Sequence, residues 1–213
     1  SAQVTTNKGQ GVRVAGITRY SDPVLLSDRR LAESRNGANG LVADFMKRLE
    51  ASLGTPETST SLTGRVASFD TALREAASRP DSDARLAATL QAASTLAAHI
   101  STVGNSIQAA RGTADKQISS QVDQLNTALA QVADLNSSIR IGLANNREIS
   151  AFVDQRQRAI DSISSIIPVH EVQRDGGGVA LYTTGGAVVL EATPAKFEFT
   201  SVGIIVPGMS QAS

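Results

Sequence analysis

The chain has 213 residues, of which 41% are hydrophobic but only 3% aromatic, and its 20 acidic residues balance 20 basic ones. The zero net charge argues against a general electrostatic attraction to nucleic acid or to an anionic membrane. The absence of cysteine excludes disulfides and thiol chemistry, and with only His99 and His170, far apart in sequence, no zinc site or other cofactor is expected. No apolar run approaches the roughly 18 residues that a membrane-spanning helix needs.

The first part of the chain predicts a short strand followed by a helix. The stretch "GVRVAGI" at Gly11–Ile17 alternates apolar and polar residues, as a half-buried strand does. A helix is expected to begin at Pro23, with Ser21 or Asp22 as its N-cap. The sequence "NGANG" at Asn36–Gly40 interrupts its apolar pattern, and each glycine costs about 1 kcal/mol in a helix interior. We therefore expect either a break there or a weak helical turn that a partner supports.

A second helix is predicted at Leu62–Ser78, where apolar residues recur at helical spacing. Pro80 blocks its continuation, and Asp81 or Ser82 can cap the helix that follows. The stretch "SRPDSD" is therefore expected to separate two helices.

The next helix has the most regular pattern in the chain. From Leu86 to Leu143 its seam residues recur at alternating steps of four and three, and the phase is kept across Gly104 and Gly112. This heptad pattern predicts one helix from about Asp81 to Leu143, about 90 Å long at 1.5 Å per residue. Such a helix cannot bury its apolar stripe against itself, so it needs neighbours within the chain or in other subunits. The seam residues expected to pack are Leu125, Leu129, Val132, Asn136 and Ile139. Asn136 either fixes the packing register or faces water near the helix end.

The stretch "FVDQRQRAIDSISSIIPVHEV" joins a charged helix to a strand. Arg156 lies on the apolar face of this helix, and burying an unpaired charge costs several kcal/mol. We therefore expect its guanidinium to reach a carboxylate or helix-end carbonyls near the β-part, so that Arg156 and Pro168 form a joint between rod and β-part. On the other face, Asp154, Arg158 and Asp161 are interpreted as solvated charges, not as an active site.

After Pro168 the apolar period changes to two. Four short strands are predicted: "VHEVQR", "VALYTT", "AVVLE" and "KFEFTS". The first two separators, "DGGG" and "GG", are hairpin turns by composition, and the third is "TPA" at Thr193–Ala195. The predicted fold class is mainly α with a small β part, a long-helix rod or bundle followed by antiparallel β-hairpins. We expect a helical rod domain with a short N-terminal strand at residues 1–167. Residues 168–213 then form a β-hairpin region that leads toward an outer domain.

No motif with catalytic chemistry is found. The "GQG" at Gly9–Gly11 lacks the third glycine of a dinucleotide loop, and "DGGG" at Asp175–Gly178 precedes a strand and not a helix. No serine lies in a G-x-S-x-G context. His170 and Glu171 are neighbours in a strand, so their side chains point to opposite faces. We expect no enzymatic activity.

Three segments in a fixed order resemble one known family. They are "GVRVAGITRYSDPVL" at Gly11–Leu25, the end of the long helix "QLNTALAQVADLNSSI" at Gln124–Ile139, and "FVDQRQRAIDSISSIIPV" followed by β-hairpins. The combination is similar to the flagellar hook-associated protein 1 family, the first hook–filament junction protein of bacteria. The chain departs from the family at Asp154–Gln157, where members resemble "DQRD" and this sequence reads "DQRQ".

The resemblance implies a structural component of the bacterial flagellum that joins hook to filament as a ring of subunits. Its partners would be other axial proteins: the hook protein, the second junction protein and copies of itself. The full-length protein would use the flagellar export machinery and a chaperone, and would be extracellular without a cleaved signal peptide. Family members also carry terminal helical segments that form an inner tube, so the chain is expected to be a middle fragment that lacks them.

Two alternatives remain open at the level of sequence. A flagellin or the second junction protein shares helical rods of this kind. A coiled-coil rod of a sensory receptor or adhesin belongs to a different class. A receptor would show a transmembrane flank in the full gene, whereas a junction protein would show amphipathic terminal helices.

Overall fold

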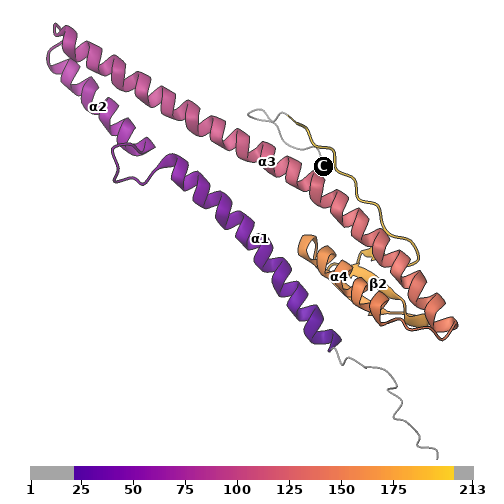
Figure 1. Ribbon diagram of the computed structural model, residues 1–213. Coiled ribbons are helices and arrows are strands. Elements are labelled where there is room, and N and C mark those ends of the chain that lie inside the picture. Colours follow the sequence, from indigo (N-terminus) through magenta and orange to yellow (C-terminus); the bar gives the residue numbers. More distant parts are fainter. Residues whose placement is uncertain (1–21, 204–213) are drawn as a thin grey trace, which may run out of the picture.

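The computed structural model describes residues 22–203 and consists, over that range, of four long helices and a small sheet (Figure 1). The helices are α1 (Pro23–Leu53), α2 (Leu62–Ser78), α3 (Asp83–Ala144) and α4 (Ser150–Ile166). The strands are β1 (Val169–Gln173), β2 (Val179–Thr183) and β3 (Val188–Leu190), with a short 3-10 turn at Asp175–Gly177 between the first two. The predicted fold class is confirmed. The strand expected at Gly11–Ile17 lies outside the described residues.

Helix α3 is the long axis of the molecule (Figure 1). It is continuous through Gly104 and Gly112, which confirms the helix predicted from the heptad pattern. Helix α2 lies beside the N-terminal part of α3, while α4 and the sheet pack against the C-terminal part of α3 (Figure 1). None of the helices in the described range is long and apolar enough to cross a membrane.

Helix α1 begins where the sequence predicted, with the Asp22 carboxylate accepting from the N–H groups of Val24 and Leu25. Of the two alternatives expected at Asn36–Gly40, the break is wrong, because the helix continues through it. Every residue from 35 to 44 is exposed, so no described part of the protein packs around this stretch. It stays helical between two anchored ends: Arg30 is buried on one side, and Phe45 and Leu49 lie half-buried against α3 on the other.

The heptad seam of α3 is buried only in its C-terminal part. Near the N-terminus, Leu90 is 72% exposed and Ile100 54% exposed. Helix α2 packs on the neighbouring face instead, where the Thr89 hydroxyl donates to the carbonyl of Ala72 at 3.0 Å. The apolar stripe on this half of α3 therefore lacks a cover among the described residues.

One hydrophobic core joins the C-terminal part of α3, α4 and the sheet. The sheet is antiparallel in the order β1-β2-β3. Its inner face presents Val169, Val179 and Leu181 to the helices, since cross-strand partners share a face. The buried core residues are Leu125, Ala128, Leu129, Val132, Ala159, Ile160, Ile163, Val169, Val179, Leu181, Val189 and Leu190.

The fourth predicted strand, "KFEFTS", is not part of the sheet. Residues 191–203, called here the C-terminal strap, run along α3 (Figure 1). Phe197 and Phe199 are half-buried and alternate with exposed neighbours, so burial follows the predicted period of two residues. A helix has no free backbone groups along its side to form a ladder, so extended chain against α3 cannot become a strand. The carboxamide of Asn126 substitutes for a ladder partner by donating to Phe197 O and accepting from Phe197 N.

Candidate functional site

The joint between α3, α4 and the sheet is a buried polar cluster around Asn136. Its Nδ2 donates to the carbonyl of Val179 at 2.8 Å, and its Oδ1 accepts from the Val179 N–H at 3.1 Å. The same Oδ1 accepts from Arg156 Nη1 at 3.0 Å. Asn136 is only 9% exposed, so the alternative in which it faces water is wrong. A single side chain on the seam thus fixes the position of β2 on the long helix.

Arg156 completes the joint from α4. Its Nη1 also donates to the carbonyl of Gly177 at 2.6 Å, and the residue is 4% exposed. Burial lowers the pKa of this guanidinium below its ordinary value, and the carboxylate of Glu171 opposes the shift. The Nε atom is buried without a hydrogen-bond partner among the described residues. Arg156 therefore contacts the amide oxygen of Asn136 and the carbonyl of Gly177. The carboxylate of Glu171 acts on it electrostatically from a longer distance.

Gly177 shows why the turn after β1 needs glycine. Its φ is +75°, and a Cβ there would lie 2.7 Å from Leu143 Cδ1 and 3.0 Å from Ile139 Cγ2. The close approach of this turn to α3 brings the Gly177 carbonyl within reach of Arg156. The "DGGG" stretch thus serves to dock the hairpin on the helix.

The other predicted joint and seam residues occupy the same region. Pro168 directly precedes β1 and follows Ile167, whose extended backbone ends α4. The apolar seam residues lie in the core beneath the joint: Leu125, Leu129, Val132 and Ile139.

A second charged cluster lies between α1, α4 and β1, and the sequence analysis did not predict it. Arg30 is 3% exposed; its Nε donates to Asp161 Oδ1 at 2.7 Å and its Nη1 to Glu171 Oε2 at 3.1 Å. Its Nη2 donates to Gln157 Oε1 at 2.6 Å. Arg29 also reaches Asp161, at 3.1 Å. The position of Arg30 four residues after Leu26, on the inner helix face, was the available signal.

Two interpretations of the charged helix change with this cluster. Asp161 is more than a solvated charge: its side chain is 39% exposed but pairs with two arginines of α1, whereas Arg158 and Ser162 are exposed. Gln157, at the position where the sequence departs from the expected "DQRD", donates to Glu171 at 3.3 Å while accepting from Arg30. An amide here can do both, which a carboxylate cannot.

Asp115 holds the end of the C-terminal strap. Its carboxylate accepts from the hydroxyl of Ser201 and from the N–H of Val202 at 2.9 Å. The Ser201 hydrogen bond and the backbone N–H groups lower the pKa of this carboxyl below its ordinary value. Asp115 and Asn126 together fix the strap on α3 at two points.

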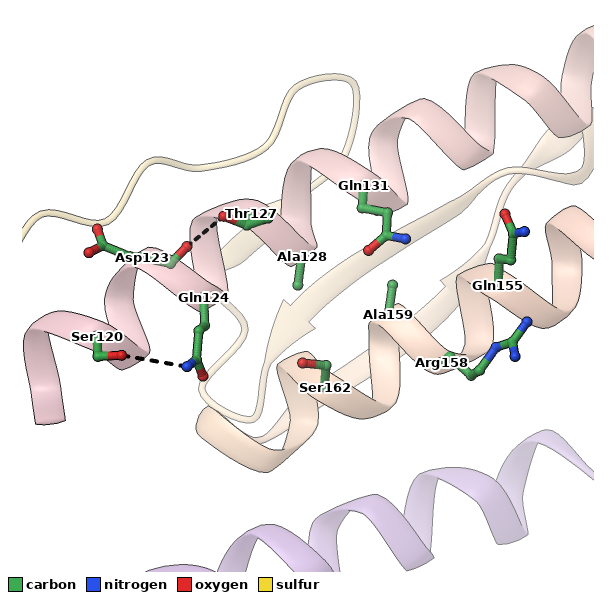
Figure 2. Close-up of a pocket in the computed structure, with 10 residues that line it drawn as sticks. All are labelled: Ser120, Asp123, Gln124, Thr127, Ala128, Gln131, Gln155, Arg158, Ala159 and Ser162. Atoms are coloured by element: carbon green, nitrogen blue, oxygen red, sulfur yellow. Dashed lines mark hydrogen bonds between the residues drawn. The ribbon is translucent and has the colours of Figure 1, made fainter.

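An open polar groove of about 760 Å³ lies between α3 and α4 (Figure 2). Ala128 and Ala159 face each other at its floor, and their small side chains let the two helices approach. Its walls carry mainly amides and hydroxyls, with Asp123 and Arg158 as the charged residues. No group of three or more His, Asp or Glu side chains in residues 22–203 could hold a metal ion.

The comparisons agree with this architecture. The family model described as "Flagellar hook-associated protein FlgK helical domain" matches residues 46–204. Flagellar hook-associated protein 1 of Salmonella typhimurium is 25% identical over 190 residues, which is 88% of this chain and 34% of that protein. The Bacillus subtilis protein of the same name is 23% identical over 204 residues, covering 94% of this chain and 39% of its own length.

A solved structure shows the same fold. The flagellar hook junction protein FlgK from Burkholderia pseudomallei superposes with a TM-score of 0.69 at 20% identity, over 78% of this chain and 29% of that one. The present chain spans about a third of the length of the curated relatives. Because the family model covers well over half of the residues, the chain belongs to the flagellar hook-associated protein FlgK family.

Proposed function

We propose that this chain is the rod portion of a structural protein of the bacterial flagellum, one that joins hook to filament as a ring of subunits. The match of the FlgK helical-domain model to residues 46–204 carries the proposal. The relatives are named as hook-associated proteins, and the solved relative as a hook junction protein. The long α3 and its firmly fixed sheet suit a subunit that spans a tube wall.

The exposed apolar stripe on α3 supports an assembled state. Leu86, Leu90 and Ile100 lie at heptad spacing and are uncovered by the described residues. Exposed apolar residues at such spacing mark a helix contact surface. In the assembled junction this stripe would be covered, either by further parts of the full-length protein or by neighbouring subunits.

The partners we propose are the hook protein, the second junction protein and further copies of the same protein. The full-length protein would pass through the flagellar export machinery with a chaperone and would function outside the cell, without a cleaved signal peptide. The proposed role is mechanical and needs no catalytic step.

Deletion of the full-length gene in its own bacterium tests the proposal. We expect hooks without attached filaments, filament protein released into the medium, and loss of swimming, all restored by the wild-type gene. Normal filaments in the deletion strain would contradict the proposal.

A pair of variants in the full-length protein locates the role on the chain. Ile100→Asp places a charge on the apolar stripe, and we expect it to abolish restoration although the purified protein keeps its helical circular-dichroism spectrum. Asn105→Asp, an exposed site five residues further along α3 and off the seam, is the matched control and should restore swimming. Equal restoration by both variants would remove the stripe from the assembly surface.

A further inference from the structure

Helix α1 has three parts that differ in how they are held. Its C-terminal part lies on α3, where Ser52 Oγ is 3.3 Å from Ser106 Oγ and Phe45 and Leu49 are half-buried. Its middle, residues 35–44, is exposed throughout. Its N-terminal part, Pro23–Ser34, is called here the arm, and it reaches α4 and β1 mainly through the Arg30 cluster.

The attachment of the arm is polar. Among the arm residues whose burial the structure describes, only Arg30 is buried. Of the apolar side chains of the arm, Val24 and Leu25 are exposed and Leu26 and Leu31 are half-buried. The polar contacts that hold it are ion pairs of Arg30 with Asp161 and Glu171, the Arg29–Asp161 pair, and the approach of Ser27 to His170 at 3.4 Å.

The arm covers the open edge of the sheet. The bond from Arg174 N to Gly178 O fixes the phase of the β1–β2 ladder, so the backbone groups of His170 and Val172 face β2. Those of Glu171 and Gln173 face the other edge, which no described strand occupies. Because Ser27 and Arg30 contact His170 and Glu171, the arm lies over this edge. Covering an edge with a helix prevents pairing with a foreign strand.

The exposed middle of α1 is suited to act as a hinge. Gly37 and Gly40 have nothing within 4 Å of the position a Cβ would occupy, so no packing offsets their helical cost. Each glycine disfavours the helix by about 1 kcal/mol relative to alanine. The helix is therefore weakest between its two anchored ends.

We propose that Arg30 is an electrostatic latch that holds the arm over the edge of β1, and that the arm opens as a separate unit at Asn36–Gly40 while the core stays folded. When the arm leaves, Glu171, whose side chain is 14% exposed, and the already 39% exposed Asp161 both gain contact with water, which solvates their charges. The core loses no apolar contact of its own, because its joint uses Asn136 and Arg156 and not α1. An arm of this length, once released, does not keep its helix, since helices shorter than about 12–15 residues are marginal in water.

Native-state hydrogen exchange on the wild-type chain tests the proposal without any substitution. We expect the amides of residues 26–34 to exchange at least about tenfold faster than those of residues 153–166 in α4, because the arm opens alone. Equal exchange of the two segments would show that they open together, and would overturn the latch.

Substitutions then test whether Arg30 is the latch. Arg30→Ala should accelerate exchange of residues 26–34 by about tenfold or more and leave α4 unchanged. Arg35→Ala, an exposed arginine of the same helix, is the matched control and should change neither segment. Gly37→Ala combined with Gly40→Ala should slow exchange of the arm by stiffening the hinge. If Arg30→Ala leaves the arm unchanged, or accelerates arm and α4 equally, the proposal is wrong.

A distance measurement gives an independent readout. The chain contains no cysteine, so spin labels at Ala32→Cys and Ala130→Cys, both exposed, report only the separation of arm and α3. The wild-type background should give one narrow distance, and Arg30→Ala a broad and longer distribution with an unchanged circular-dichroism spectrum of the core. A narrow, unshifted distance in folded Arg30→Ala would overturn the proposal.

Discussion

Asn136 and Val179 pair across 43 positions of sequence as two strands of a sheet would, with a side-chain amide on one side and a backbone on the other. The carboxamide donates to the carbonyl and accepts from the N–H of the same residue. Through Asn136, helix α3 therefore makes one pair of hydrogen bonds to the backbone of β2 that resembles a pair in a β-ladder. The consequence is a sheet with a fixed position along a helix about 90 Å long.

The joint predicts a large difference between two arginines of α4 that are two positions apart. Arg156→Ala removes two buried hydrogen bonds and leaves the Gly177 carbonyl and Asn136 Oδ1 short of a donor. We expect a loss of about 2 kcal/mol in the free energy of unfolding, a fall of roughly 4–8 °C in melting temperature for a chain of this size. Arg158→Ala, exposed at the groove, should stay within about 0.5 kcal/mol. Thermal unfolding of both variants measures this, and equal melting temperatures would contradict it.

The two asparagines of α3 that bind backbone should also differ. Asn136→Ala leaves the buried N–H and C=O of Val179 unpaired, so we expect a loss of about 2 kcal/mol and faster exchange throughout the sheet. Asn126→Ala releases Phe197 of the strap, which water can reach, so the melting temperature should change little while the Phe197 amide loses protection. Exchange at single-residue resolution separates the two. A sheet unaffected by Asn136→Ala would show that the joint does not position β2.

The strap is expected to loosen in acid. Its hydrogen bonds lower the pKa of Asp115 in the folded state, so folding is favoured by the ionised carboxylate. This contribution is present above the ordinary Asp pKa of about 3.9 and is lost as the pH falls below it through the lowered folded value. Exchange of the Val202 amide should therefore accelerate, after correction for its intrinsic pH dependence, as the pH falls below about 3.9.

The substitution Asp115→Asn gives the control for this titration. It removes the ionisable group, so protection of the Val202 amide should be weaker at neutral pH and should no longer change across the acidic range. A strap that loosens at the same pH in Asp115→Asn would assign the transition to another carboxylate.

Glycines of the long helices can be sorted by the space around them. Gly104 and Gly112 in α3 have nothing within 4 Å of a built Cβ, so each change to alanine should raise the free energy of unfolding by about 0.8–1 kcal/mol. A Cβ on Gly64 in α2 would lie 2.3 Å from the carbonyl oxygen of Thr58, so Gly64→Ala should destabilise by about 1–3 kcal/mol. Denaturant unfolding at constant m-value measures all three. A loss of stability on Gly104→Ala or Gly112→Ala would indicate that these sites are covered in solution.

Strong local signals in the sequence were enough to predict several of the elements. The unbroken heptad phase fixed α3 as one helix, because a turn would reset the phase. Pro80 and the glycine turns marked boundaries, and the position of Arg156 on an apolar helix face indicated a buried guanidinium that must find partners. These signals are local, since each depends on residues within a few turns of one another.

The hydrogen-bond partners of the buried polar groups could not be predicted from the sequence and are known from the tertiary structure. Arg30 and Asp161 are 131 positions apart, and no local pattern relates them. The strap shows that a correct local prediction is not enough to make a strand. Its period of two correctly predicts an extended chain. A strand also needs a neighbouring strand backbone, and the neighbour here is a helix. Of the break and the weak helical turn that were both open at Asn36–Gly40, the break does not occur, because anchors on both sides, at Arg30 and at Phe45, hold the turn helical. Long-range pairing, and not local propensity, settles each of these points.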